Sequence, residues 1–587
     1  MIKMFKRFTK KDWLIVSVIV VLICGHVWLD LKLPDYMSAI TKLIQTENSK
    51  MSEILTNGGM MMLCAFGSLV ATIVVGYLSS HLSASFSRLI RKKIFTKVSD
   101  FSMGEINKFH TSSLITRTTN DVTQIEMFIS MGLQLLIKAP IMAIWAVTKI
   151  VNKNLQWSMV ILTAVFILLL TIITIMLIVL PRFEKIQKMI DKVNGVVREN
   201  LTGIRVVRAF NAEKFQTERF ETVNSDLTKM QMFNQKAFAL LGPIMNLVMH
   251  SVTLSIYFVG TFLINRAGML DKINLFSDMV VFTSYGMQVI ASFLMLAFII
   301  MILPRAQISA KRINEVLDQE ISIKEGSFNK DTKEKGIVEF KNVSFKYPDA
   351  DENILEDISF KVNKGETIAF IGSTGSGKST LINLIPRFYD VTSGSILIDG
   401  VDVREYKEET LNNKIGYISQ KAVMFTGTVN SNVGYGYNKD GKVSDKKIKE
   451  AIKVAQAEDF VLTMDDKYDS HIARGGTNVS GGQKQRLSIA RAIAKNPEIY
   501  IFDDSFSALD YKTDKLLRKE LKKYTKDATI MIVAQRIGTI VGADKIVVLD
   551  EGKCVGIGTH KELLKNCEVY KEIALSQLSK EELEHAW

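Results

Sequence analysis

The hydrophobic residues of this chain are concentrated in long runs within its first 304 positions. The clearest run covers residues 155–180, where no Lys, Arg, Asp or Glu interrupts the sequence. A helix of about 20 apolar residues is long enough to cross the hydrocarbon core of a membrane. The runs therefore predict six membrane spans, at about residues 13–33, 57–85, 127–151, 154–181, 237–265 and 277–304.

The third predicted span carries the weakest signal, because Lys138 interrupts it. It is retained since an even number of spans leaves both chain ends on the same side of the membrane. The N-terminus holds five basic residues before Asp12, and residues 88–126 hold seven basic residues against four acidic ones. The positive-inside rule therefore predicts that both termini are cytoplasmic. Lys149 and Lys153, in a short loop on the opposite side, run against this rule.

Two of the connections between spans are long, polar and helical in pattern. About forty residues join spans two and three, and about fifty join spans four and five. A helix rises about 1.5 Å per residue, so twenty extra residues would project about 30 Å beyond the membrane. We therefore expect two helical hairpins that reach into the cytoplasm. A small separate cytoplasmic domain is the alternative.

The sequence pattern changes at Gly336. Short β-rich runs at 337–340, 367–371, 499–502 and 530–533 alternate with helical stretches, which is typical of an α/β domain. The expected fold is thus multidomain, with an all-α polytopic membrane domain and an α/β domain. Its predicted parts are the membrane domain at 1–320, a linker at 321–335, the α/β domain at 336–577 and a C-terminal tail at 578–587.

Composition supports this division between lipid and water. Hydrophobic residues make up 47% of the chain, yet 23% of its residues are charged. The net charge is +13, but the clearest basic clusters flank membrane spans, so we expect no nucleic-acid partner. The four cysteines lack metal-binding spacing, which fits buried thiols in a reducing compartment. Disordered and disulfide-rich secreted classes are excluded.

Residues 372–380 match the phosphate-binding pattern G-x-x-x-x-G-K-[ST], and they lie between a predicted strand and a predicted helix. Glycines let backbone N–H groups converge on phosphate oxygens, and the helix N-terminus adds a positive field. Lys378 would neutralise the outer phosphates, and the Ser379 hydroxyl could bind magnesium. The predicted phosphate loop is Gly372, Ser373, Thr374, Gly375, Ser376, Gly377, Lys378, Ser379 and Thr380.

Two further segments of the α/β domain suit the same chemistry. The apolar run 499–502 ends in two carboxylates: Asp503 would support magnesium, and Asp504 would face the γ-phosphate and the attacking water. Residues 479–483 open a predicted helix with a hydroxyl and bare backbone amides, which makes a second anion site. This second segment consists of Val479, Ser480, Gly481, Gly482 and Gln483.

Together these motifs resemble the nucleotide-binding domain of an ATP-binding cassette (ABC) transporter, with residues 479–483 as its signature. The six spans and long hairpins resemble the membrane domain of an ABC exporter. The resemblance implies ATP and Mg²⁺ as ligands. It also implies that Tyr347 stacks on adenine, that Gln420 senses magnesium and water and couples to the membrane domain, and that Asp510 lies in a loop crossing between two nucleotide domains.

The same resemblance implies where the cytoplasmic hairpins have their tips. Residues 107–121 are similar to the first tip, and residues 198–210 to the run into the second. These tips and Gln420 would form a transmission surface, through which closure of the nucleotide domains is passed to the membrane domain.

Three positions depart from the family pattern. Asp504 stands where the family usually has Glu, Gln535 where it has His, and Arg474 where exporters often have Glu. Asp is one methylene shorter, so its carboxylate falls short of the attacking water by roughly a bond length. Gln can donate a hydrogen bond but cannot hold a titratable charge. The two changes in one site predict that it binds ATP and hydrolyses it poorly.

The resemblance as a whole implies a half-transporter in a bacterial plasma membrane that exports small amphipathic or hydrophobic compounds. Because its signature is intact, we expect a heterodimer in which a second half-transporter carries Glu and His at the positions of Asp504 and Gln535, as in heterodimeric multidrug exporters. The alternatives are a lipid flippase, a peptide or porphyrin exporter, and a regulatory subunit that binds ATP without hydrolysing it.

Polar residues within the spans give weaker signals. Asn246, His250, Thr253 and Tyr257 share one helix face in span five, and Ser284, Gln288 and Ser292 share one in span six. Such faces either line a substrate path or form hydrogen bonds between helices. His26 and Cys24 point to different helix faces, so no metal or haem site is predicted there.

Overall fold

The structure is a computed structural model that describes residues 1–46, 49–151, 155–438 and 441–577. The predicted C-terminal tail, 578–587, lies outside the described residues. The chain divides into two compact units. The first unit consists of Met1–Ser99 and Thr111–Gln319, and the second of Asp100–His110 and Glu320–Trp587.

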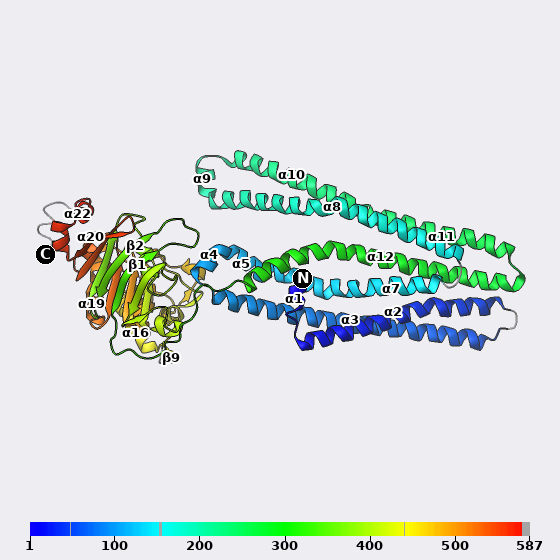
Figure 1. The fold of residues 1–587 in the computed structure, drawn as a ribbon, viewed down its shortest axis with the longest axis horizontal. Helices are drawn as coiled ribbons and strands as arrows, with labels where there is room; N and C mark the ends of the chain where they lie inside the picture. The colour runs from blue at the N-terminus through cyan, green and yellow to red at the C-terminus, as the bar shows by residue number, and fades with distance from the viewer. Residues whose placement is uncertain (47–48, 152–154, 439–440, 578–587) are drawn as a thin grey trace. The chain divides into compact units, whose positions relative to one another are not determined.

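The first unit is built of helices (Figure 1). Among its described residues, six helical stretches are long and apolar enough to cross a membrane, as the hydrophobic runs predicted. The helices are α1 (Ile2–Phe5), α2 (Lys10–Gln45), α3 (Met51–Ser99), α5 (Thr111–Thr118), α6 (Asn120–Met127), α7 (Leu133–Val151), α8 (Leu155–Thr202), α9 (Ile204–Ala209), α10 (Glu213–Ala239), α11 (Leu241–Arg266) and α12 (Met269–Leu317), with one π-helical turn at Phe128–Gly132.

Three of these helices are far longer than a membrane is thick. α3 and α12 have 49 residues each, and α8 has 48. At about 1.5 Å per residue each measures about 70 Å, against a hydrocarbon core of about 30 Å. The two long connections thus begin as continuations of α3 and α8 and return through shorter helices, and the described residues form no separate cytoplasmic domain in them.

The hairpin of α8 and α10 is closed by the short helix α9. Near this end the guanidinium of Arg219 on α10 donates two hydrogen bonds to the carboxylate of Glu199 on α8, at 3.0 and 2.9 Å. At the tip the side chains of Val206 and Phe210 are 61% and 78% exposed within this chain. The tip thus presents apolar side chains that the rest of the chain leaves uncovered.

Polar contacts join α2 to α7 and α12. The hydroxyl of Tyr285 on α12 donates to Asp35 of α2 at 2.8 Å, and the ammonium of Lys149 on α7 lies 2.8 Å from the same carboxylate. Lys149 does not follow the positive-inside rule. Its ion pair with Asp35 of α2 explains why a lysine stands at this position. The Ser38 and Ser277 hydroxyls form a further α2–α12 contact at 2.6 Å.

The second unit holds two main sheets. The strands β2-β1-β4-β5 form an antiparallel sheet, and β14-β13-β3-β12-β11-β6 form a six-stranded, mainly parallel sheet. The strands are β1 (Val338–Phe345), β2 (Leu355–Val362), β3 (Thr367–Gly372), β4 (Ser393–Ile398), β5 (Val401–Asp402), β6 (Ile415–Ile418), β11 (Ile499–Asp503), β12 (Thr529–Val533), β13 (Lys545–Asp550) and β14 (Lys553–Gly558), with short pairs β7 (Gly427–Thr428) with β10 (His471–Ile472) and β8 (Tyr437–Asn438) with β9 (Gly441–Lys442).

Helices cover these sheets, and apolar side chains fill the space between them. Phe340 and Phe360 lie on paired strands of the antiparallel sheet, and their stacked rings have centroids 4.5 Å apart. The ring centroids of Phe360 and of Phe370 on β3 are 5.5 Å apart. The helices of this unit are α4 (Met103–Phe109), α13 (Lys378–Asn383), α14 (Glu408–Lys414), α15 (Val429–Val433), α16 (Asp445–Val454), α17 (Glu458–Leu462), α18 (Gly481–Lys495), α19 (Tyr511–Tyr524), α20 (Ile537–Ile540), α21 (His560–Asn566) and α22 (Glu568–Leu575).

The strand register brings the predicted motifs to one edge of the parallel sheet. Strand β12 pairs in parallel with β3 on one side and with β11 on the other, and β11 pairs with β6. The carboxyl ends of parallel strands form the usual ligand-binding edge of such a sheet. Gly372, Asp503 and Val533 end three of these strands, so segments more than a hundred residues apart meet there.

Candidate nucleotide-binding site

The loop that joins β3 to α13 needs its glycines for steric reasons. Gly375 and Gly377 have φ angles of +88° and +90°, which residues with a Cβ atom rarely adopt. A Cβ atom on Gly372 would lie 2.0 Å from the carbonyl oxygen of Leu549. The sequence therefore folds here into a tight turn whose backbone can approach a phosphate group closely.

The side chain of Lys378 folds back over this loop. Its ammonium donates hydrogen bonds to the carbonyl oxygens of Ser373 and Gly372, at 2.6 and 3.1 Å. Burial lowers the pKa of Lys378, and the carboxylates of Asp504 and Asp503 counteract this effect. The loop thus carries a cation at the position where the outer phosphates of a nucleotide would need one.

Ser379 and Asp503 form an oxygen-rich pair suited to magnesium. The Ser379 hydroxyl donates to Asp503 Oδ1 at 2.8 Å, and Asp503 is only 6% exposed. Burial raises the pKa of Asp503, so a bound cation would relieve the cost of keeping this carboxylate ionised. Mg²⁺ usually takes one or two protein oxygens plus substrate phosphates and water. The residues present therefore fit the ion that the motifs imply.

The carboxylate of Asp504 is held by two glutamines. The side-chain amides of Gln420 and Gln535 both donate to Asp504 Oδ2, at 3.1 and 3.0 Å. Asp504 is 8% exposed, and its φ of +46° turns the chain sharply after β11. Three predicted site residues from three segments are thus brought together around one oxygen atom.

Tyr347 lies beside the end of the phosphate loop. Its hydroxyl is 3.0 Å from the hydroxyl of Thr380, and its ring makes an edge contact with Tyr389 at 5.2 Å. Sequence reasoning missed Tyr389, and it also missed Tyr417, whose hydroxyl lies 3.5 Å from Asp503 Oδ2. Tyr389 lies in no recognisable motif, and Tyr417 lies three residues before Gln420. Only the tertiary fold reveals the contacts that their hydroxyls make.

The signature segment opens α18 with an N-terminal cap. The Ser480 hydroxyl accepts from the backbone N–H of Gln483 at 3.3 Å, and the Gln483 side chain accepts from the Ser480 N–H at 2.8 Å. A Cβ atom on Gly481 would meet nothing within 4 Å, so this backbone lies open on one side. Asp510 instead caps α19, where its carboxylate accepts from the N–H of Thr513 at 2.9 Å.

The first hairpin tip begins earlier than predicted. The tip helix is α4, Met103–Phe109, whereas Thr111–Asp121 belongs to α5 and α6 of the membrane unit. Ser102 caps α4, and the Glu105 carboxylate accepts from the Ser322 N–H at 3.1 Å. The Asn107 side chain donates to the Tyr389 hydroxyl at 3.2 Å. The hydrogen bonds of Glu105 and Asn107 therefore connect α4 to Ser322 and Tyr389 of the same unit.

The two polar faces within the spans differ. Gln288 of α12 donates to the Asp30 carbonyl oxygen at 3.3 Å, and Ser292 is fully buried, so the face on α12 joins helices. On α11, Asn246 and His250 are exposed, and Tyr257 is 44% exposed. The α11 face thus stays uncovered within this chain.

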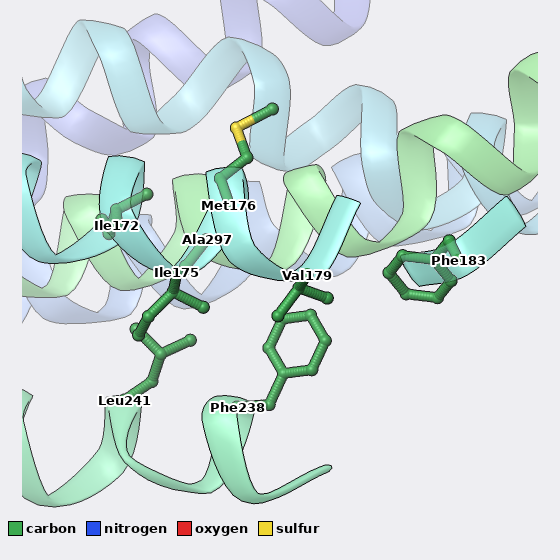
Figure 2. Close-up of a pocket in the computed structure, with 8 residues that line it drawn as sticks. All are labelled: Ile172, Ile175, Met176, Val179, Phe183, Phe238, Leu241 and Ala297. Carbon is green, nitrogen blue, oxygen red and sulfur yellow. The ribbon is translucent and has the colours of Figure 1, made fainter. Parts of the chain in front are cut away.

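An apolar pocket lies between α8 and its neighbours. Figure 2 shows Ile175 of α8 facing Leu241 of α11, and Val179 of α8 facing Phe238 of α10. Every lining side chain is apolar: Ile172, Ile175, Met176, Val179, Phe183, Phe238, Leu241 and Ala297.

Comparison with known proteins matches both units. Residues 15–293 match the family model for the ABC transporter transmembrane region, and residues 355–507 match that for the ABC transporter. An uncharacterised ABC transporter ATP-binding protein of Mycobacterium bovis is 39% identical over 521 residues, which are 88% of this chain and 87% of that protein. A Bacillus subtilis protein, named for multidrug export as an ATP-binding/permease protein, is 34% identical over 82% of each chain.

The fold agrees with these matches. The solved structure of a bacterial Atm1-family ABC exporter with ATP bound aligns with a TM-score of 0.81, covering 97% of this chain and 100% of that one at 22% identity. The membrane unit, the phosphate loop and the signature helix all belong to this architecture. The chain is a member of the ABC transporter family: an exporter-type half-transporter with a six-helix membrane domain and one ATPase domain.

Proposed function

We propose that this chain is one subunit of a heterodimeric bacterial exporter, and that its own ATP site binds nucleotide but hydrolyses it slowly. The observation that carries the proposal is the pair of glutamine amides on Asp504 Oδ2. A general base must reach the proton it removes within about 2.6–3.2 Å. A shortened carboxylate with one oxygen already bound by two donors is poorly placed to do so.

Gln535 contributes to this in a second way. A histidine at this position could hold a positive charge beside the γ-phosphate, whereas an amide stays neutral at every pH. In this structure the amide nitrogen of Gln535 donates a hydrogen bond to Asp504 Oδ2 at 3.0 Å. Both changes lower the rate of hydrolysis, and neither removes the phosphate loop, Lys378 or the Ser379–Asp503 pair that would bind MgATP.

The signature supports a second chain. Its backbone at Gly481 lies open, and its capping contacts are intact. The signature can bind phosphate, but it does not form part of the slowly hydrolysing ATP site on its own chain. It therefore has a function if it completes an active ATP site on the partner. We therefore expect the partner to carry Glu and His at the positions of Asp504 and Gln535.

The transported compounds would be small and amphipathic or hydrophobic. Support comes from the apolar pocket of Figure 2 and from the uncovered polar face of α11, which together offer apolar and hydrogen-bonding surfaces. The multidrug name of the Bacillus relative points the same way. The transporter would lie in the plasma membrane, with both termini in the cytoplasm.

The first prediction concerns how much of the ATP hydrolysis takes place at the site of this chain and how much at the site of the partner. In the purified complex, Asp504→Asn should lower drug-stimulated ATPase activity by about twofold or less, because this site contributes little turnover. Removal of the partner's catalytic Glu should lower it by about 10²-fold or more. Steady-state phosphate release measures both.

The heterodimer proposal would be contradicted if this chain alone showed full drug-stimulated ATP hydrolysis. It would also be contradicted if Asp504→Asn abolished ATP hydrolysis by the complex. A complex that binds ATP but transports none of the tested compounds would instead favour a regulatory subunit. Lipids, peptides and porphyrins belong in the same screen, because each tests one of the alternatives.

The second prediction concerns the phosphate loop. Lys378→Ala should weaken ATP binding to this chain by about 10- to 100-fold, since a charge-assisted hydrogen bond contributes about 1.5–3 kcal/mol. Photolabelling with an azido-ATP analogue over a range of concentrations measures this. Lys364→Ala removes a half-exposed lysine of the same unit and is the matched control. Equal labelling of both variants would refute the assignment of the loop.

The third prediction concerns coupling through α4. Tyr389→Phe keeps the ring beside Tyr347 but removes the hydroxyl that accepts from Asn107. Drug stimulation of ATPase activity should fall by about half, while ATP affinity should stay unchanged, because only the contact to the tip helix is lost. Tyr511→Phe, at a tyrosine that is 77% exposed, is the control. Unaltered stimulation in Tyr389→Phe would exclude this contact from the transmission surface.

A further inference from the structure

A group of ionisable and polar side chains lies within the membrane unit, away from the nucleotide site. His26 and Asp30 come from α2, Ser68 and Thr72 from α3, and Lys138 from α7. His26 is 7% exposed, and the side chains of Asp30 and Lys138 are 20% and 24% exposed. Ionisable residues within membrane spans are costly and usually serve ion or substrate movement.

Lys138 is the charge that weakened the third predicted span, and the structure gives it partners. Its ammonium lies 2.6 Å from His26 Nε2 and 3.7 Å from Asp30 Oδ2. The other oxygen of Asp30 accepts from the Ser68 hydroxyl at 2.6 Å. The cluster therefore joins α7 to the antiparallel pair of α2 and α3.

The Nε2 atom of His26 lies close to one hydrogen-bond donor and one hydrogen-bond acceptor, which require opposite protonation states of this nitrogen. The Lys138 ammonium, at 2.6 Å, is a donor and needs an unprotonated nitrogen. The Asp30 carboxylate, at 2.9 Å, is an acceptor and needs a protonated one. A single nitrogen cannot satisfy both at once, so the cluster has two competing hydrogen-bond arrangements.

In the first arrangement His26 is neutral. Nε2 accepts from Lys138, and Nδ1 carries the hydrogen that it donates to the Thr72 hydroxyl at 2.7 Å. Thr72 in turn donates to the Ser68 carbonyl oxygen at 2.9 Å. Nδ1 also lies 3.2 Å from the Ser68 carbonyl oxygen, which can only accept. In this arrangement the contact between the unprotonated Nε2 and the Asp30 carboxylate is unfavourable.

In the second arrangement His26 has taken up a proton from water. Nε2–H donates to Asp30, and Nδ1–H still donates to Thr72. Lys138 then loses its acceptor on the ring and lies beside a second positive charge, with one carboxylate shared between two cations. Repulsion between unit charges a few ångströms apart is strong in a poorly solvated site. The ammonium of Lys138 must move away.

We propose that His26, Asp30 and Lys138 form an intramembrane proton-binding site that controls the contact between α2 and α7. The ligand is a proton, held on His26 Nε2, and its uptake releases Lys138 from α2.

The charged groups around the site support this assignment. Among the described residues, the neighbouring contacts from α3 come from the uncharged Ser68 and Thr72, with the thiol of Cys64 one turn away. α12 contributes the amide of Gln288, which binds the Asp30 carbonyl oxygen. The imidazole is thus the one group of the cluster whose ordinary pKa falls between about 5 and 8.

Beyond the cluster, a cavity of about 420 Å³ lies against both α2 and α7. It is lined by Trp28, Leu31, Lys32, Trp145, Thr148 and Lys149. The second ion pair between these helices, Lys149 with Asp35, contains no imidazole. Asp30 lies twenty residues after Lys10, or about 30 Å along the helix, so the site is near the membrane face opposite the N-terminus.

Spin-label distances between α2 and α7 test the proposal. Trp28→Cys and Trp145→Cys, which line the same cavity, would be labelled in a chain whose four native cysteines are replaced. The full-length chain, with any partner that co-purifies, would be measured in lipid nanodiscs without nucleotide from pH 8 to pH 5. The distances should lengthen as pH falls, because a proton on Nε2 displaces Lys138.

His26→Gln should abolish this shift, because its amide cannot gain a charge, and Lys138→Met should abolish it because nothing is repelled. His81→Gln is the matched control, since His81 is an exposed histidine on α3, and it should leave the shift intact. A shift that persists in His26→Gln or Lys138→Met, or a parent chain without one, would overturn the proposal. The measurement involves neither ATP nor a transported compound, so its outcome is separate from the proposed export function.

Discussion

The parallel register of β3, β12, β11 and β6 is the constraint on which the nucleotide site depends. It places the ends of four strands at one edge of the sheet, although the segments come from residues 372 to 533. Because β11 and β12 are in register, Asp504 follows the end of one strand while Gln535 follows the end of the next. The contact between their side chains, at 3.0 Å, is a direct result of that pairing. The phosphate loop, Asp504 and Gln535 are thus all placed by the same edge of the sheet.

The membrane unit depends on a different kind of contact. Its helices expose apolar side chains to lipid, so association between them rests more on specific polar contacts than on hydrophobic burial. α2 contributes two carboxylates, Asp30 and Asp35, and each has a lysine of α7 as partner. The two pairs are thus ionic contacts between α2 and α7.

Much of this architecture could be predicted from the sequence, because its signals are local. The apolar runs, the glycine pattern of residues 372–377 and the capped start of α18 each depend on neighbours in the chain. Long-range contacts gave no such signal. Nothing near Lys138 indicates that His26 and Asp30 face it from another helix, and nothing near Tyr389 indicates its contact with Asn107. The first hairpin tip begins earlier than the sequence indicates because its helix, Met103–Phe109, makes contacts with Ser322 and Tyr389, which are distant in the sequence.

The central claim is that this chain holds ATP without rapidly hydrolysing it while its partner turns over. The most direct measurement is the identity of the nucleotide on each subunit during steady-state turnover, by photocrosslinking an α-labelled azido-ATP and separating the two chains. The account predicts triphosphate on this chain and mainly diphosphate on the partner. Diphosphate appearing on both chains at the same rate would contradict it.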